Sequence, residues 1–238
     1  MTRYGLIPDS PELMARYPVS FSDERRQDHT TWTELGIPIH GQGDRPSCAG
    51  HAWANAIELI LAREHGKAIF GEHGQLDGEA VWKHARERFY RGDLDGGLTL
   101  RQAFLACRDI GILSPETNMR RLPRDITPCY TQLDSTPVVT GHMVWDAWYR
   151  ADPTNGYIPA GPLRNGLGGH AVVLDRILLQ DGESYPGGLN SWREFGWHST
   201  YLMALGMWQA SLLAAPVAPV FGGDWKGWRG WEKYIIEV

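Results

Sequence analysis

The sequence is poor in cysteine, in charge of one sign and in long apolar runs, and each shortage argues against a class of protein. Only 3 cysteines occur in 238 residues, which is too few, and odd in number, for the disulfide framework of a secreted domain. No run of 18 apolar residues is present, so no membrane-spanning segment is predicted. The formal net charge of -5 gives no electrostatic argument for a nucleic-acid partner.

The first residues also lack the apolar stretch of a secretory signal peptide. We therefore expect a cytoplasmic protein without a signal peptide, with association to a virion as the alternative. The content of 42% hydrophobic residues is enough for a substantial core. The sequence thus predicts one globular domain. The two ends of the chain are considered separately below.

A loop rich in Gly and Pro turns into a helix at Cys48. Residues 41–48 (GQGDRPSC) cannot propagate a regular element, whereas Ala and aliphatic residues recur at helical spacing from Cys48 to Leu61. Free N–H groups and the helix dipole favour a thiolate at a helix start, as a nucleophile requires. The alternative is a small cysteine that only fills the core. Gln42 argues against that alternative, because its amide is placed to help bind an oxyanion.

Two later segments place polar residues at the mouths of predicted strands. His170 begins an apolar run at 168–174 (GGHAVVL), and Asn190 ends another at 189–192 (LNSW). His51, one turn after Cys48, is an alternative partner for the thiol. A base on the same helix would be poorly aligned to pass a proton to a leaving group, so His170 is favoured. We expect Cys48 and His170 to lie within reach of a hydrogen bond or an ion pair.

With a Cys, a His and an Asn in this order, the chain resembles the papain-like cysteine peptidases, of the bacterial or phage type without a long propeptide. The resemblance rests on Gln42 and Cys48 six residues apart at a helix start, on the His-Ala-Val strand and on the Asn-Ser-Trp run, and it covers about residues 37–210. It implies an α+β fold of two lobes, an α-rich first half and a β-rich second half, with the active site in the cleft between them.

Four residues depart from the family pattern. Arg45-Pro46 stand where the family usually has Cys-Gly, Ala49 stands where it has Trp, and Arg193 stands where it prefers Gly. A loop disulfide and an aromatic wall beside the nucleophile are therefore missing. We expect these changes to alter the shape of the substrate subsites more than the chemistry.

The resemblance also implies the roles of individual residues. Cys48 is the expected nucleophile, His170 the base, Asn190 the residue that orients the imidazole, and Gln42 the oxyanion donor together with the Cys48 N–H. The residues expected to bind substrate are Gly96, Gly97, Gly169 and Trp192, with Trp192 also shielding the hydrogen bond between His170 and Asn190. Gly96 and Gly97 on their own indicate only a tight turn.

No cofactor and no metal is expected. His65 and His73 lie in repeated Glu-His-Gly tripeptides, but no third ligand has a suitable spacing, so both are predicted to be exposed loop residues.

The domain organisation expected from these observations has three parts. An extended N-terminal arm occupies 1–36, the papain-like catalytic domain 37–213, and a Pro/Ala spacer with a Trp-rich tail 214–238. The stretch 114–134 is expected to be a loop between the halves. The tail tryptophans, Trp225, Trp228 and Trp231, are expected to pack against the body, with docking to a partner or a glycan as the alternative.

The function that this predicts is a thiol-dependent endopeptidase acting on a peptide or protein substrate through an acyl-enzyme. One rival is a papain-fold structural or binding subunit of a larger assembly such as a phage particle, which would bind its partner through the arm or the tail. The other is a cell-wall amidase or transpeptidase with the same thiol chemistry. No nucleic acid and no membrane enters any of these interpretations.

Overall fold

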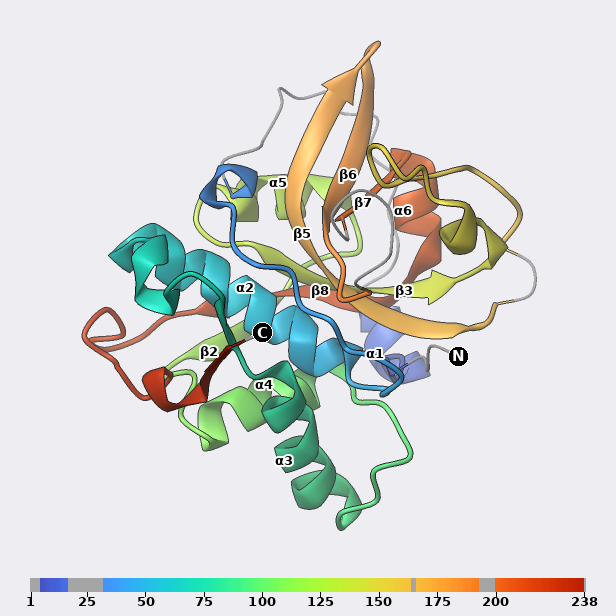
Figure 1. Ribbon diagram of the computed structural model, residues 1–238. Helices are drawn as coiled ribbons and strands as arrows, with labels where there is room; N and C mark the ends of the chain where they lie inside the picture. Colours follow the sequence, from blue (N-terminus) through green and yellow to red (C-terminus); the bar gives the residue numbers. More distant parts are fainter. Residues whose placement is uncertain (1–4, 17–31, 164–165, 193–199, 238) are drawn as a thin grey trace.

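The computed structural model describes residues 5–16, 32–163, 166–192 and 200–237. Most of its helices precede residue 134 and most of its strands follow residue 137. Figure 1 shows α2, α3 and α4 gathered below the sheet strands β3, β5, β6 and β8. This confirms the expected α+β arrangement, with an α-rich first half and a β-rich second half.

The helices are α1 (Pro11–Arg16), α2 (Cys48–His65), α3 (Gly78–Tyr90), α4 (Leu100–Asp109), α5 (Ile126–Leu133) and α6 (Leu205–Ser211), with short 3-10 turns η1 (Thr33–Leu35), η2 (Lys67–Phe70), η3 (Asp146–Arg150) and η4 (Glu232–Tyr234). The strands are β1 (Gly74–Leu76), β2 (Asn118–Arg121), β3 (Val138–Val144), β4 (Tyr157–Ile158), β5 (Gly168–Gln180), β6 (Glu183–Leu189), β7 (Thr200–Met203), β8 (Leu212–Val220) and β9 (Ile235–Glu237).

Helix α2 forms the centre of the core. Every residue from Cys48 to Ala62 is buried, because α3, α4 and strand β5 all pack around this helix. Small residues allow the close contact with α3, since a Cβ added at Gly50 would lie 2.3 Å from the Gly78 carbonyl oxygen. A residue at the start of α2 is therefore held in a rigid frame.

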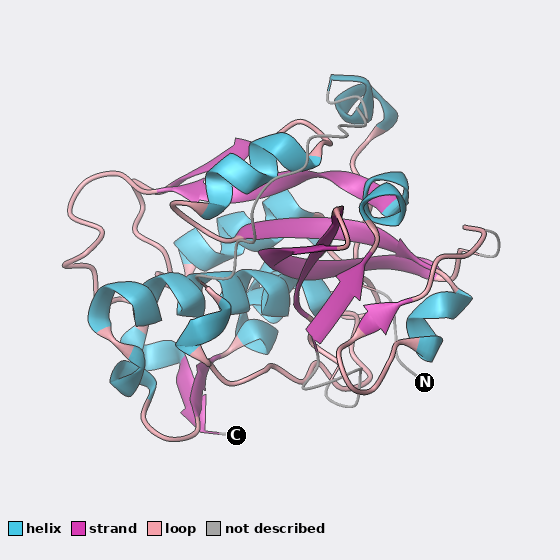
Figure 2. Ribbon diagram, turned by 90° about the horizontal axis from the view of Figure 1, so that it is seen from above, coloured by secondary structure: helices cyan, strands magenta, loops and turns pink. Residues whose placement is uncertain are grey.

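The larger sheet has seven strands in the order β2-β8-β3-β5-β6-β7-β4. Strands β3 and β5 pair antiparallel without interruption, from Val138 opposite Leu174 to Val144 opposite Gly168. Beyond this pairing, β5 and β6 continue as a long hairpin that projects from the body (Figure 1). Figure 2, viewed from above, shows the helices beside the sheet strands. The start of β5, where His170 lies, packs against α2.

Three segments expected to be irregular contain regular elements. The predicted spacer at 214–220 belongs to β8, which pairs with β2 on one side and β3 on the other. Its two prolines are tolerated because a proline carbonyl still accepts a bond, as Pro216 does from the Leu122 N–H at 2.8 Å. The predicted loop at 114–134 contains β2 and α5, and the arm contains α1 and η1.

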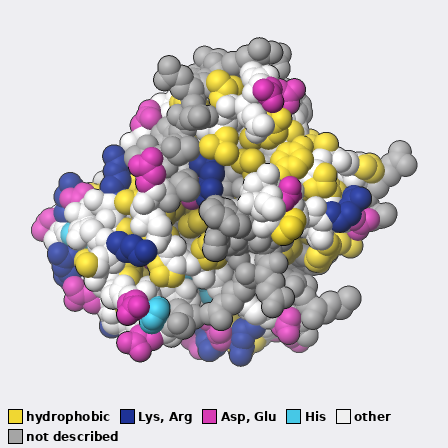
Figure 3. Space-filling view, turned by 45° about the horizontal axis from the view of Figure 1, so that its top comes forward, with side chains coloured by type: hydrophobic (Ala, Val, Ile, Leu, Met, Phe, Trp, Pro, Cys, Tyr) yellow, Lys and Arg dark blue, Asp and Glu magenta, His cyan; other side chains and the backbone are white. Residues whose placement is uncertain are grey.

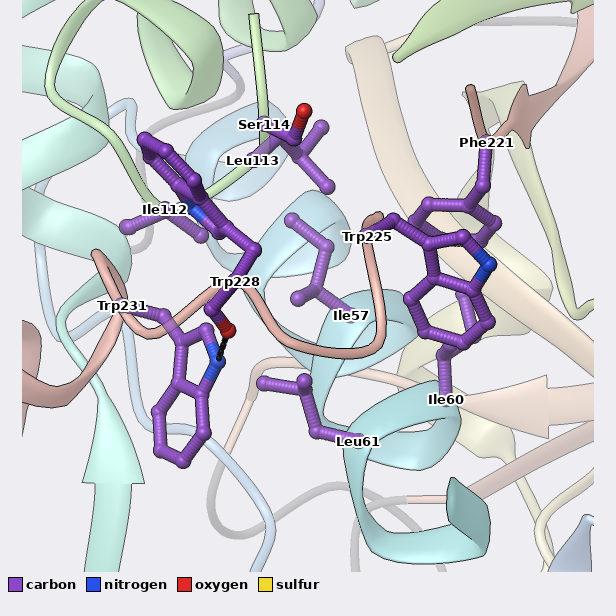
Figure 4. A pocket seen from close by; sticks show the side chains of 10 residues that line it. All are labelled: Ile57, Ile60, Leu61, Ile112, Leu113, Ser114, Phe221, Trp225, Trp228 and Trp231. Carbon is purple, nitrogen blue, oxygen red and sulfur yellow. Dashed lines mark hydrogen bonds between the residues drawn. The ribbon is translucent and has the colours of Figure 1, made fainter. Parts of the chain in front are cut away.

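The Trp-rich tail packs against the body. Figure 4 shows Trp225, Trp228 and Trp231 around a small apolar pocket over α2, with Phe221 closing one side. The Trp228 indole donates to the Gly111 carbonyl at 2.9 Å, and the Trp231 indole donates to the Trp228 carbonyl at 2.8 Å. Strand β9 then pairs with β1. Trp231 is buried and Trp225 and Trp228 are half-buried, so the three tryptophans pack against the body, as expected.

The surface drawn in Figure 3 divides into two regions. Most of the Lys, Arg, Asp and Glu side chains lie over its left half, with both signs interspersed, and hydrophobic side chains gather at the upper right. Among the described residues, no helix has the length and apolarity to cross a membrane.

Candidate active site

The fold brings together the ends of several elements that carry the four residues expected to perform the chemistry. Cys48 is the first residue of α2, Gln42 lies in the loop before it, His170 lies near the start of β5, and Asn190 directly follows β6. The Ala171 N–H points at Cys48 Sγ at 3.4 Å, so the thiol lies against the strand that carries His170. All four side chains are buried.

The imidazole of His170 is held on three sides. Its Nε2 lies 2.7 Å from Asn190 Oδ1, and the Trp192 ring stacks on it at 4.3 Å between centroids. The Trp148 ring lies perpendicular to the imidazole, with 5.7 Å between the ring centroids. Because an amide oxygen only accepts, Nε2 carries the proton and Nδ1 keeps a lone pair. That Nδ1 is buried and has no hydrogen-bond partner among the described residues.

The hydrogen bond expected between Cys48 and His170 is therefore not formed in this arrangement. Burial raises the pKa of the Cys48 thiol to about 11, although backbone hydrogen bonds from Ala171 and Gly5 oppose the shift. Burial also lowers the pKa of His170 to about 4. Both groups are neutral near pH 7, opposite to the thiolate expected from the helix start, because exclusion of water outweighs the helix dipole.

Gln42 is fixed by the residue after Asn190. Its Oε1 accepts from the Ser191 hydroxyl at 2.7 Å, and its backbone N–H donates to the Ser191 carbonyl at 2.9 Å. Its Nε2 donates to the Arg45 carbonyl at 2.9 Å. No role was predicted for Ser191, although its position next to Asn190 in the sequence could have indicated one.

An N-terminal segment of the same chain lies against the thiol. Residues 5–9, called the arm segment below, pass between Leu98 and Gly169, and the space between these two residues is called the peptide site. The Leu6 N–H donates to the Gly169 carbonyl at 3.0 Å, and the Ile7 N–H donates to the Leu98 carbonyl at 2.8 Å. Leu98 N–H donates in turn to Gly5 O at 2.7 Å. The segment is thus bound by backbone bonds on both sides.

Side-chain contacts explain why this segment fits. Gly5 has no room for a side chain, since a Cβ there would lie 2.0 Å from Pro46 O. The Leu6 side chain is 6% exposed and lies over Gly141, where an added Cβ would be 2.4 Å from Leu6 Cδ2. The absence of a side chain at Gly5 and the apolar side chain of Leu6 make the arm segment complementary to the peptide site.

Asp9 fastens the other end of the arm segment to β8. Its backbone N–H donates to the Leu213 carbonyl at 3.3 Å, and its carboxylate accepts the Ala215 N–H at 3.0 Å. Arg121 lies 3.8 Å from the same carboxylate. The carboxylate thereby takes the place of a strand partner at this point of β8.

Of the residues expected to bind substrate, Gly97 and Gly169 adjoin the arm segment. A Cβ at Gly97 would lie 1.8 Å from Gly5 O, so only glycine permits this approach. The carbonyl of Gly96 instead accepts from the Trp82 indole at 2.9 Å. Trp192 covers the imidazole and stacks on the exposed ring of Tyr149.

Removal of the base is expected to cost more than removal of its orienting amide. His170→Ala should lower kcat/KM by about 10²–10⁴-fold, the range for a general base. Asn190→Ala should lower it much less, because Trp192 and Trp148 still hold the ring. Steady-state hydrolysis of a peptide by the two variants checks this, and equal losses would show that Asn190 does more than orient the imidazole.

Some expected features fall outside this description. Arg193, one of the departures from the family pattern, lies outside the described residues. Within the described part of the chain, no group of three His, Cys, Asp or Glu side chains is arranged to hold a metal.

Solved structures of cysteine proteases share this architecture. Xylellain, a cysteine protease from Xylella fastidiosa, matches with a TM-score of 0.71 at 17% identity, over 92% of this chain and 96% of that one. Digestive procathepsin L 3 of Tenebrio molitor matches at 0.63 and 16% identity, over 92% and 75%. Bromelain from Ananas comosus matches at 0.62 and 16%, over 83% and 100%. No family model and no curated protein matches the sequence. The chain has the fold of the papain-like cysteine peptidases.

Proposed function

We propose that this chain is a thiol-dependent endopeptidase. Cys48 Sγ attacks the carbonyl carbon of a peptide bond while His170 Nδ1 takes the thiol proton, and the carbonyl oxygen becomes an oxyanion near Gln42 and the Cys48 N–H. The oxyanion collapses, the C–N bond breaks, and His170 returns its proton to the leaving amine. Water, deprotonated by His170, then attacks the thioester and releases the acid.

The observation that carries this proposal is a peptide already bound beside the thiol. The arm segment is held by backbone bonds to Leu98 and Gly169, and its Gly5 backbone reaches Cys48. Backbone bonds of this kind recognise a peptide whatever its side chains are. The segment continues past the peptide site to Asp9 and α1, as a substrate cut internally would have to do.

The bound arm segment is not placed for cleavage. The Gly5 carbonyl oxygen is engaged by the Leu98 N–H at 2.7 Å, while Gln42 Nε2 donates to Arg45. The Gly5 carbonyl therefore does not lie in the oxyanion position. A substrate can enter only after the arm segment has left the peptide site, and the chain as described is the closed form of the enzyme.

The rival role as a structural or binding subunit rests on the same closed site. A thiol covered by its own chain, with its pKa raised to about 11, would be equally suited to a protein that no longer reacts. The two roles differ in what happens when the arm segment leaves, because only an enzyme then gains a reactive thiolate.

Labelling by a peptidyl epoxide separates the two roles. With the arm segment displaced by Leu6→Glu, such an epoxide is expected to alkylate the activated thiol, and peptide mapping should place the label on Cys48. Cys107 and Cys129 should stay unlabelled, since both are buried with strongly raised pKa values. Equal labelling of all three cysteines would favour the structural role.

A further inference from the structure

A buried cluster of three ionisable side chains lies outside the machinery described above. His40 comes from the loop that leads to Gln42, and His51 and Glu58 come from α2. His40 and Glu58 are 0% exposed and His51 is 5% exposed. Burial of ionisable groups is costly, so such a cluster needs a reason.

The three side chains are joined in a line. His40 Nε2 lies 2.8 Å from Glu58 Oε1, and His40 Nδ1 lies 3.0 Å from His51 Nδ1. Glu58 Oε1 also accepts the backbone N–H of Leu76 in β1. The other carboxylate oxygen of Glu58 is buried without a hydrogen-bond partner among the described residues. His40 is therefore the main compensation for the Glu58 charge.

The geometry determines where the protons lie. Nε2 of His40 faces a carboxylate oxygen and carries a proton, and the two facing Nδ1 atoms share one proton between them. If His40 holds that proton it is an imidazolium, and the cluster has no net charge. If His51 holds it, a buried negative charge is left uncompensated, which is the costlier arrangement. In agreement, burial and the charge on His40 hold the pKa of His51 well below its usual value.

The cluster ties the loop before the nucleophile to the nucleophile's own helix. His51 is three residues after Cys48, and Glu58 lies about two helical turns further along α2. His40 is two residues before Gln42, whose side-chain oxygen and backbone N–H are bonded to Ser191. The loop is thus anchored to α2 through His40 and to the β-rich half through Ser191.

We infer that His40, held as an imidazolium between Glu58 and His51, is a positioning residue that sets the place of Gln42 relative to Cys48. An oxyanion needs the Gln42 amide and the Cys48 N–H on the same oxygen at about 2.7–3.1 Å. A direct contact between the loop and α2 fixes the position of the Gln42 amide relative to the Cys48 N–H. The inference rests on the proposed function, since it assigns His40 a part in the same reaction.

A double-mutant cycle between His40 and Gln42 tests this inference. The full chain carries Leu6→Glu throughout, which is meant to displace the arm segment. Gln42→Ala should lower kcat by about 10²–10³-fold, the usual loss of an oxyanion donor. His40→Asn should lower kcat about tenfold with little change in KM, because it misplaces a donor without removing it. The double variant should match Gln42→Ala alone, because His40 acts through Gln42.

Conservative replacements show whether the contact between His40 and Glu58 is the one that positions Gln42. His40→Gln places an amide near the position of Nε2 and should recover most of the kcat lost in His40→Asn. If the His40→Asn variant does not fold because Glu58 is left unpaired, the variant His40→Asn/Glu58→Gln removes the Glu58 charge. That variant then takes the place of His40→Asn in the cycle. Losses that multiply in the double variant, or equal kcat values for His40→Asn and His40→Gln, would overturn the inference. Turnover that survives Cys48→Ala in the same background would instead overturn the proposed function.

Discussion

Cys48→Ala is expected to abolish peptide hydrolysis and leave the fold intact. The covalent step has no substitute once the sulfur is gone, so kcat should fall by at least about 10⁴-fold. The side chain is small, and its loss removes only weak contacts from backbone N–H groups, such as that of Ala171 at 3.4 Å. A cost of about 1 kcal/mol would lower the melting temperature by only about 2–4 °C in a chain of this size.

Cys107→Ala is the matched control for this substitution. Cys107 is as fully buried as Cys48 but lies within α4, away from its start. Its replacement should cost similar stability and leave turnover unchanged. Residual hydrolysis by Cys48→Ala above a few percent of the parent rate would place the nucleophile elsewhere.

Leu6→Glu is expected to open the peptide site. Leu6 is the apolar anchor of the arm segment, and burial of a leucine side chain contributes about 1.5–3 kcal/mol. A carboxylate in its place would also have to be desolvated beside Gly141 and Gly169. We therefore expect the rate of peptide hydrolysis to rise by about tenfold to a hundredfold or more.

The reactivity of Cys48 reports the same opening without a substrate. Burial raises the pKa of Cys48 to about 11, so entry of water should lower that pKa. The rate of alkylation by iodoacetamide should then reach its plateau at a lower pH in Leu6→Glu than in the parent. Gly5→Ala should behave alike, because its Cβ would lie 2.0 Å from Pro46 O. Glu12→Ala, on the exposed helix α1, is the control. Unchanged alkylation in both arm variants would contradict a closed site.

The two halves of the fold were predictable because their local signals are strong. Ala and aliphatic spacing after Cys48 indicates a helix wherever it occurs, and the apolar run after His170 indicates a strand. Strand β8 was missed because two prolines in seven residues signal a spacer. What makes 214–220 a strand is the presence of β2 and β3 on either side, which are distant in sequence.

The residues of the expected site could be proposed from the sequence, but the protonation and covering of the thiol could not. Cys48, His170, Asn190 and Gln42 could be named because each has a distinctive neighbourhood along the chain. The arm segment carries no periodic pattern, and its conformation comes from backbone bonds to the two walls of the peptide site. The reversal of the expected thiol pKa follows from the complete burial of Cys48, which depends on how the whole chain packs. The pairing of His40 with a carboxylate of α2 likewise depends on how the loop returns to that helix.

The central claim is that one thiol performs hydrolysis once the arm segment has left. Stepwise alkylation of the Leu6→Glu chain with iodoacetamide tests it most directly, with the modified fraction of each cysteine measured by peptide mapping. The account predicts that peptide hydrolysis falls in proportion to the fraction of Cys48 modified and vanishes when Cys48 is fully alkylated, while Cys107 and Cys129 remain free. Hydrolysis that persists with Cys48 fully modified, or that is lost while Cys48 is still free, would contradict it.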